Sequence, residues 1–349
     1  MRFSILVAVY VVFLSTPSNA RQAEVRFVDV GSGLCVIAKF PHDNELLYDA
    51  GQGNGSNCYD AIDELVEDDH IEMIVISHPD SDHLGELNEI LLGLDGSQGI
   101  GQVEDDPTRF TAGRILHTGY DRSHEIAGGP ASWRNAMAAI EFARQEGAEV
   151  INLESEPLRP GDEFDVGEAT VTFIAGWPSW EQSGERNAIS IVLHVEYGGR
   201  SVLLTGDSVG RQDDDPTSIC GYAQRIMVDR AGRIPLSADV MQSSHHGADN
   251  GDAMCFIEAV NPDYIVISAG NKYEHPRSTT VDRYLAWGIS PERIYRTDLH
   301  GTDEGDREWQ GGPIDRCPDR DRNDTVIVNI PEDITQPISV AYENSFSTC

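Results

Sequence analysis

Residues 77–83, Ser-His-Pro-Asp-Ser-Asp-His, constrain the fold of this chain more than any other stretch of its sequence. Two imidazoles and two carboxylates, all able to bind a metal, fall within six consecutive positions. The apolar run 71–76 directly before them predicts a buried strand, and residues 84–87 begin a helical pattern. A buried strand thus leads directly into a loop of polar side chains. Close packing of the two carboxylates and two imidazoles there costs free energy unless a positive charge neutralises the carboxylates.

The metal-capable residues of this motif are His78, Asp80, Asp82 and His83. A mixed set of nitrogen and oxygen ligands suits zinc first, with manganese or iron as alternatives. Carboxylates at alternate positions can face two ions rather than one. The opposing interpretation is a polar loop in which His and Asp occur by chance, and the rest of the chain has to decide between the two.

Three later segments repeat the pattern of a strand that ends in polar or glycine-rich residues. These predicted strands comprise residues 201–205, 239–243 and 264–268. The polar residues that follow them are Asp207, the pair His245 and His246, and His275. Sites in mixed α/β sheets assemble from loops at one edge, so four such strand ends argue against chance and predict one shared site.

The rest of the chain alternates between strand and helix patterns. Further strands are predicted at residues 23–30, 34–40, 45–49, 114–117, 149–153, 170–175, 188–196, 325–330 and 338–342. Helices are predicted at residues 58–69, 132–147 and 252–260. The first three strands are separated by glycine turns and indicate an antiparallel meander. The helix predicted at residues 58–69 connects this meander to the strand at 71–76.

The acidic balance of the chain limits which partners it can bind. Asp and Glu number 59 against 25 Lys and Arg, which gives a formal net charge of −34 at pH 7. A field of this sign repels nucleic acid and anionic lipid over much of the surface. We therefore expect no nonspecific nucleic-acid binding, and a polyanionic substrate needs a metal or a local arginine cluster to hold it.

The N-terminus is typical of an exported protein. Arg2 is followed by an apolar stretch over residues 5–14, and small residues at Ser18 and Ala20 fit a signal peptidase site. The stretch is short for a transmembrane helix, and no later segment has the length to cross a bilayer. We expect a signal peptide at residues 1–20 and a secreted or periplasmic protein; an uncleaved anchor is the alternative.

Export favours disulfide bonds for the six cysteines, whose spacing is not typical of a metal site. Spacing does not determine their connectivity. Proximity in the sequence alone favours the pairs Cys35–Cys58, Cys220–Cys255 and Cys317–Cys349.

Several motifs together resemble one protein family. The stretch SHPDSDHLGEL is similar to the HxDxDH form of the metal motif of the metallo-β-lactamase superfamily. The stretches FVDVGSG, LLYDAGQG, NAISIVLHVEYGGRSVLLTGD, SSHHGAD and ISAGNKYEHP resemble, in the same order, the hydrolase domain of ComEC-type competence proteins and their stand-alone relatives. The resemblance covers about residues 24–300. It implies an α/β fold of the four-layer αββα sandwich type, a metal site at one edge and hydrolytic chemistry.

The resemblance also implies how the chain is organised. We expect residues 21–349 to form a single hydrolase domain with acidic loops and a C-terminal extension from about residue 301. Competence proteins carry membrane-spanning channel segments that are missing from this sequence. We therefore expect the hydrolase module alone, with no membrane span after signal cleavage; the oligomeric state is left open.

The metal ligands follow from the resemblance residue by residue. His78 and Asp80 would serve one ion, Asp82 and His83 the second, and Asp207 would bridge the two. The fuller form of the motif has a histidine where this chain has Asp80, which makes the first site richer in oxygen. Occupancy by one ion instead of two is therefore an open alternative.

The remaining site residues take their roles from the same resemblance. One histidine of the pair completes the second site; we favour His246 as the ligand and His245 as a substrate contact, with the reverse order left open. Asn187 stands where other branches have a further ligand histidine, and His275 lies in a stretch similar to a family motif. Asp49 would orient a ligand histidine.

These residues predict a metal-dependent hydrolase. A water on one or two zinc ions loses its proton near neutral pH and attacks a phosphorus or a carbonyl carbon. Asp82 can take the proton, and a protonated His245 or His275 can offset the negative field around a phosphodiester. We expect a phosphodiester substrate. The alternatives are hydrolysis of a carboxylic ester, lactone or β-lactam, and a non-catalytic acidic binding module.

Overall fold

The computed structural model describes ten segments of the chain. They are residues 21–53, 57–93, 108–126, 129–176, 186–212, 215–216, 218–270, 273–297, 307–313 and 324–343. The expected signal peptide at residues 1–20 and the expected pair Cys317–Cys349 lie outside these residues.

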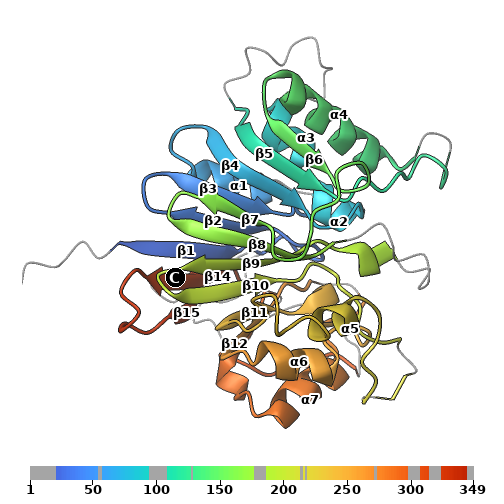
Figure 1. The fold of residues 1–349 in the computed structure, drawn as a ribbon, viewed down its shortest axis with the longest axis vertical. Coiled ribbons are helices and arrows are strands. Elements are labelled where there is room, and N and C mark those ends of the chain that lie inside the picture. Colours follow the sequence, from blue (N-terminus) through green and yellow to red (C-terminus); the bar gives the residue numbers. More distant parts are fainter. Residues whose placement is uncertain are drawn as a thin grey trace, which may run out of the picture.

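Two mixed β-sheets lie face to face between two layers of helices (Figure 1). The first sheet has the order β15-β14-β1-β2-β3-β4-β5-β6. Its strands are β1 (Gln22–Phe27), β2 (Val36–Phe40), β3 (Asn44–Tyr48), β4 (His70–Ile76), β5 (Thr111–His117), β6 (Glu149–Asn152), β14 (Val326–Pro331) and β15 (Ser339–Tyr342).

The second sheet has the order β13-β12-β11-β10-β9-β8-β7. Its strands are β7 (Glu163–Val166), β8 (Ala169–Ala175), β9 (Val192–Tyr197), β10 (Arg200–Leu204), β11 (Val240–Gln242), β12 (Tyr264–Ile267) and β13 (Ile294–Arg296).

Helices cover the outer face of each sheet (Figure 1). On the first sheet lie α1 (Asn57–Leu65), α2 (Ser81–Leu84), α3 (Leu87–Leu92) and α4 (Ala131–Gln145). On the second lie α5 (Tyr222–Val228), α6 (Met254–Val260) and α7 (Ser278–Trp287). This arrangement is the αββα sandwich that the sequence motifs implied, and that prediction is confirmed.

The alternation of side chains along β4 shows how one strand serves two interfaces. Met73 and Val75 belong to the apolar core between the sheets, whereas Ile74 and Ile76 belong to the core between the first sheet and its helices. Successive strand residues point to opposite faces, so a strand covered on both sides has to be apolar throughout. A third core packs the second sheet against α5, α6 and α7.

Parallel pairing brings strand ends to one edge. β3 to β6 run parallel in the first sheet, and β10 to β13 run parallel in the second. The other neighbouring strands pair antiparallel, including the predicted meander of β1, β2 and β3. Carboxyl ends of parallel strands share an edge, and loops there can build a common site.

Several elements were not predicted from the sequence, and two of them are strands of only four and three residues. β7, β13, α5 and α7 were not predicted, and β1 ends at Phe27 rather than at residue 30. The helix predicted at residues 58–69 is shorter and spans Asn57–Leu65. Three or four strand residues give too little periodicity to stand out from a loop.

Two of the expected disulfide bonds are present. Cys35 pairs with Cys58 and Cys220 with Cys255, each with 5.9 Å between the Cα atoms. Among the helices that the structure describes, none is long and apolar enough to cross a membrane.

Candidate metal centre

The motif at residues 77–83 begins one residue after the end of β4, and α2 starts inside it. Asp80 immediately precedes α2 in an extended conformation, so the chain turns there into the helix. Asp82 and His83 lie within α2, while His78 stays on the loop. The strand and the short helix thus present the motif's side chains from two directions.

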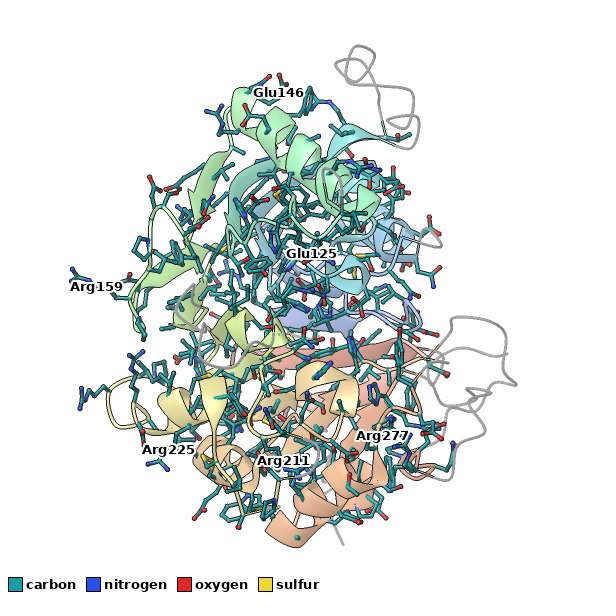
Figure 2. All side chains as sticks on the ribbon, turned by 90° about the vertical axis from the view of Figure 1, so that its right-hand side faces the viewer. Glu125, Glu146, Arg159, Arg211, Arg225 and Arg277 are labelled. Carbon is teal, nitrogen blue, oxygen red and sulfur yellow. A yellow bond between two sulfur atoms is a disulfide. The ribbon has the colours of Figure 1, made fainter. Side chains whose placement is uncertain are left out.

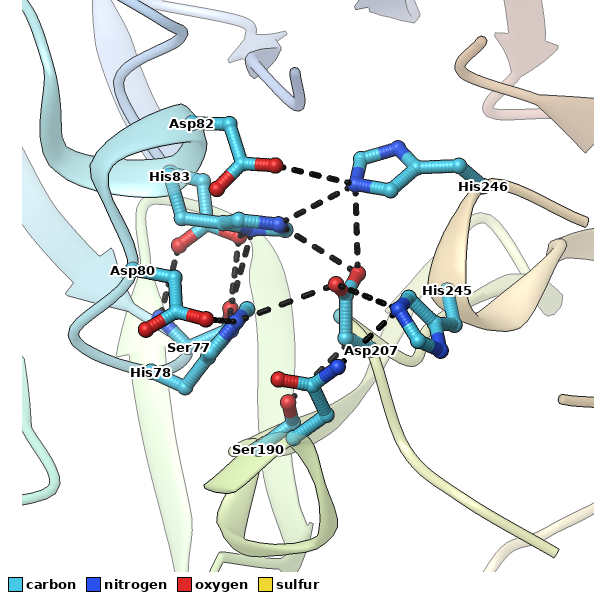
Figure 3. Close-up of polar contacts among 12 residues, drawn as sticks. Ser77, His78, Asp80, Asp82, His83, Ser190, Asp207, His245 and His246 are labelled. Carbon is cyan, nitrogen blue, oxygen red and sulfur yellow. Dashed lines mark hydrogen bonds and ion pairs between the residues drawn. The ribbon is translucent and has the colours of Figure 1, made fainter. Parts of the chain in front are cut away.

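Asp207 is the point on which four imidazoles converge (Figure 3). It follows β10 and is buried, with its backbone N–H donating to Ser190 Oγ at 3.1 Å. The Nε2 atoms of His83, His246, His78 and His245 lie 3.3, 3.5, 3.7 and 3.8 Å from its carboxylate oxygens. The strand ends predicted to meet therefore do meet.

Two sets of side chains could hold an ion. In each set the ligand atoms all lie within 4.8 Å of one another. The first set is His78, His83 and Asp207, and the second is Asp82, His83 and His246. His83 belongs to both.

Residues behind the centre determine which imidazole nitrogens face it. Asp49 Oδ2 accepts from His83 Nδ1 at 2.7 Å and from Ser77 Oγ at 2.7 Å. Ser77 Oγ in turn accepts from His78 Nδ1 at 3.1 Å, and the carbonyl of Ser268 accepts from His246 Nδ1 at 2.7 Å. Each Nδ1 carries its proton outward, so each Nε2 offers a lone pair to the centre.

These lone pairs fit a metal ion. His83 Nε2 and His246 Nε2 are only 3.3 Å apart, and His78 Nε2 and Asp207 Oδ1 are buried without a hydrogen-bond partner among the described residues. Facing lone pairs and orphaned buried polar atoms are costly unless a cation lies between them. The donor set of imidazoles and carboxylates matches zinc, manganese or iron.

The electrostatics of the site also favour positive charge. Burial opposes a charge on His83, but Asp207 and Asp49 outweigh burial and raise the pKa of His83 well above its usual value. Burial likewise opposes the charge on Asp207, yet His83, His246 and His245 hold its pKa well below the usual range. The carboxylate is therefore ionised, as a metal ligand has to be.

His245 and His246 lie on a strained turn after β11. Both residues have positive φ, 51° and 55°, within the short helix η4 (Ser244–Gly247). His246 joins the second ligand set, as favoured from the sequence, whereas His245 belongs to neither set. Instead, His245 Nδ1 donates to Asn250 Oδ1 at 2.7 Å, and Asn187 Nδ2 donates to His245 Nε2 at 2.9 Å.

Asp80 has different partners from those expected of a metal ligand. Arg186 donates to both of its oxygens, at 2.8 and 3.1 Å, and Arg122 donates to Oδ1 at 3.0 Å. Its distance to His78 Nε2 is 3.8 Å, and it lies in neither ligand set. Burial opposes its charge, but His78 and Arg186 lower the pKa of Asp80, so it is an ionised partner of the arginines.

His275 lies beside the centre without joining it. Its ring centroid is 6.3 Å from that of His245, and its Nδ1 is buried without a partner in the described segments. Burial, with His246 and His245 nearby, lowers the pKa of His275 to about 3. A neutral His275 can exchange hydrogen bonds with a substrate, but the positive charge expected of it is disfavoured.

A cavity of about 490 Å³ opens onto these residues. Its lining includes Asp82, Asp207, Asn187, His245, His246 and His275 from the sequence prediction. It also includes four arginines that the sequence analysis did not single out: Arg122, Arg186, Arg277 and Arg307. Arg122 could have been found, because it follows β5, whose parallel pairing with β4 brings its end to the same edge.

Comparisons with known proteins agree with this architecture. Residues 28–270 match the family described as "Metallo-beta-lactamase superfamily". ComE operon protein 3 of Bacillus subtilis (strain 168) is 23% identical over 336 residues, which cover 90% of this chain and 37% of that protein. Competence protein ComA of Neisseria gonorrhoeae is 25% identical over 291 residues, covering 82% and 32%.

Among solved structures, the diiron β-hydroxylase CmlA from Streptomyces venezuelae is 17% identical with a TM-score of 0.45, over 81% of this chain and 54% of CmlA. The chain spans about a third of the length of the two curated relatives. The family match, in contrast, covers well over half of the chain and includes the motif of residues 77–83, Asp207 and both histidines of η4. The chain belongs to the metallo-β-lactamase superfamily.

Proposed function

We propose that this protein is an exported, metal-dependent hydrolase that cleaves a phosphodiester with a metal-activated water. Metal-dependent hydrolysis is the general chemistry of its superfamily, and the convergent imidazoles and carboxylates support it. The phosphodiester, the zinc ion and the export are the specific parts of the proposal.

The charge of the cavity is the observation that carries the choice of substrate. Among the described residues, its lining holds four arginines and four aspartates, so their formal charges cancel. The protein as a whole carries a net charge of −34. Glu125 and Glu274, which pair with these arginines from outside the lining, add two negative charges. A divalent ion would offset them, and a cavity without net negative charge in so acidic a protein favours an anionic substrate.

Five residues of the site would serve as metal ligands. The ion would be held by His78, His83, His246, Asp82 and Asp207, and it would lower the pKa of a bound water and polarise the scissile phosphate. The two ligand sets share His83, and together they would allow either one ion or two.

Proton transfer and substrate placement fall to side chains at the cavity wall. Asp82, whose side chain is 28% exposed, is the carboxylate that can take the proton of the attacking water. Asn187 and Asn250 fix the ring of His245 beside Asp207, where it can contact the substrate. His275 supplies a further neutral hydrogen-bonding group at the same wall.

Export is supported by the cysteines. Cys35–Cys58 and Cys220–Cys255 form two disulfide bonds, and such bonds persist in oxidising compartments. A secreted or periplasmic location is therefore part of the proposal, together with the predicted signal peptide at residues 1–20.

Metal analysis with a substrate panel tests the function. The purified protein, loaded in turn with zinc, manganese and iron, is assayed with bis(p-nitrophenyl) phosphate, p-nitrophenyl acetate, a lactone and a chromogenic β-lactam. We expect bound transition metal and release of nitrophenol from the phosphodiester. Turnover of only the carboxylic substrates would refute the phosphodiester, and failure to bind any transition metal would leave the non-catalytic binding module.

A further inference from the structure

We infer that Arg277 and Arg307 form a second anion subsite, which binds a phosphate group of the substrate other than the one that is cleaved. This inference rests on the proposed function, because it extends the substrate from a simple phosphodiester to one with an additional phosphate. Both arginines line the cavity that holds Asp207 and His246. Arg277 follows the predicted site residue His275 by two positions, whereas Arg307 comes from a segment that had no predicted link to the site.

The segment of residues 307–310, here called the strap, is tied to the start of α7 by backbone pairing. Arg277 and Glu308 form an antiparallel bridge. Ser278 N donates to Arg307 O at 2.7 Å, and Trp309 N donates to Pro276 O at 2.8 Å. The strap therefore lies directly beside the loop of His275, although about 30 residues separate them in the sequence.

A buried arginine at the edge of the second sheet holds the strap by hydrogen bonds. Arg296, at the end of β13, is only 1% exposed. It donates to Glu308 Oε1 at 3.2 Å and to Gln310 Oε1 at 3.1 Å, and it also contacts the carbonyl of Trp309. Anchoring on both sides holds Arg307 at the cavity rather than leaving it on a loose loop.

One carboxylate orients the two guanidinium groups. Glu274 Oε2 accepts from Arg277 Nη1 at 2.5 Å and from Arg307 Nε at 2.8 Å, and Arg307 Nη2 lies 2.6 Å from the same oxygen. Arg277 Nε and Nη2 and Arg307 Nη1 have no hydrogen-bond partner within the described part of the chain. Considering only the segments described, donors remain on both arginines, and the shared partner Glu274 limits the motion of the two guanidinium groups.

This arrangement fits a phosphate better than a carboxylic ester or an uncharged group. Arg277, Arg307 and Glu274 together carry one positive charge. Asp249 also lines the cavity with a negative charge, and its carboxylate accepts a hydrogen bond from Thr279 Oγ1. A guanidinium binds phosphate oxygens through parallel N–H donors, and such charge-assisted bonds are the stronger kind.

The side chain of Arg307 is 67% exposed, so its replacement leaves the core intact. Arg307→Gln removes the charge, and Arg307→Lys keeps the charge but loses the fork of donors. The matched control is Arg225→Gln, because Arg225 on α5 is similarly exposed and paired with an acid, Asp229 at 2.9 Å. Figure 2 shows Arg225 well apart from Arg277.

Two chromogenic diesters that differ by one phosphate test the subsite in the metal-loaded protein. They are the p-nitrophenyl ester of thymidine 5′-phosphate and the same compound with a 3′-phosphate. We expect Arg307→Gln to raise KM for the phosphate-bearing diester about tenfold, because one charge-assisted contact is lost. We expect kcat to be unchanged. KM for the plain diester should change much less, because that compound has no phosphate for this subsite. Arg307→Lys should lie in between, and Arg225→Gln should match the wild type.

A binding experiment separates failure of the subsite from failure of the proposed function. Inorganic pyrophosphate is titrated into metal-free protein by calorimetry, and we expect Arg307→Gln to weaken its binding at least about fivefold, consistent with one lost contact. No turnover of either diester, with this weakening present, would refute the hydrolase and retain the subsite. The subsite would be refuted by either of two results. One is that Arg307→Gln leaves KM unchanged for both diesters, and the other is that it leaves pyrophosphate binding unchanged.

Discussion

Asp207 is the residue on which the candidate centre depends most. It is buried, its Oδ1 is without a hydrogen-bond partner among the described residues, and four imidazoles surround it at 3.3 to 3.8 Å. It is the only acid of the predicted site that comes from the second sheet. Asp207 therefore supplies the negative charge that the second sheet offers to an ion bound between the sheets.

We predict that Asp207→Asn greatly reduces metal content and abolishes turnover. The substitution keeps the shape of the side chain but removes the charge that balances the cation. Metal content is measured by elemental analysis after dialysis, and a loss of activity of at least about 100-fold is expected, since the ion supplies the activated water. Asp165→Asn, on an exposed position of β7, is the control. Full activity of Asp207→Asn would show that the centre lies elsewhere.

A second prediction concerns Asp49, which touches the centre only through His83 and Ser77. Asp49 has φ of 62°, a conformation that Asn adopts readily, so Asp49→Asn leaves the backbone unstrained. We expect metal affinity to fall about 10- to 100-fold, because the imidazole loses its carboxylate partner. Competition with a chromogenic chelator measures the affinity. An unchanged affinity would contradict an orienting role.

At the level of elements, β3 carries a buried acid that the site does not use. Glu45 is fully buried, with both carboxyl oxygens lacking hydrogen-bond partners among the described residues. Glu72 on β4 lies beside it, and Lys39 Nζ on β2 is 3.8 Å away. Burial, and then Glu72, raise the pKa of Glu45 to about 8.

This pKa predicts how stability changes with pH. Folded Glu45 retains a proton that the unfolded chain releases above its usual pKa of 4.5. Its contribution to stability is therefore present below pH 4.5 and is lost as the pH rises towards 8. Glu45→Gln should accordingly stabilise the protein more at pH 8 than at pH 5, with a difference on the order of 1–3 kcal/mol.

Denaturant unfolding of wild type and Glu45→Gln at both pH values measures this difference. Glu163→Gln, on an exposed position of β7, should show no such dependence on pH. An equal effect of Glu45→Gln at pH 5 and pH 8 would mean that Glu45 is ionised in the folded protein.

For the whole molecule, the net charge of −34 is the dominant property. Like charges repel within a compact protein, and salt screens this repulsion because the Debye length shortens from about 14 Å to about 4 Å between 0.05 and 0.5 M. We predict that NaCl over this range raises the free energy of unfolding, on the order of 1 kcal/mol. Metal-free protein is used, so that added salt cannot act by changing metal binding. Stability that is constant or falls with salt would contradict this expectation.

Local patterns in the sequence predicted the strand ends of the candidate site, and the resemblance to the superfamily implied the layers that carry it. His78, Asp82, His83, Asp207 and His246 were identified because each follows an apolar run long enough to mark a buried strand. An apolar run and the polar residues after it are neighbours in the chain, so their relation is readable without a structure. The antiparallel meander and two of the disulfide pairs were predictable for the same reason of proximity.

Tertiary structure alone decided what surrounds those residues. Asp80 has the sequence position of a ligand, yet two arginines from distant segments, Arg122 and Arg186, hold its carboxylate. Arg307 reaches the cavity because the strap pairs with the start of α7, about 30 residues away in the sequence. Contacts of this kind depend on the paths of loops that have no periodic pattern. Residue types and strand ends therefore followed from the sequence, whereas the charge balance of the cavity followed only from the fold.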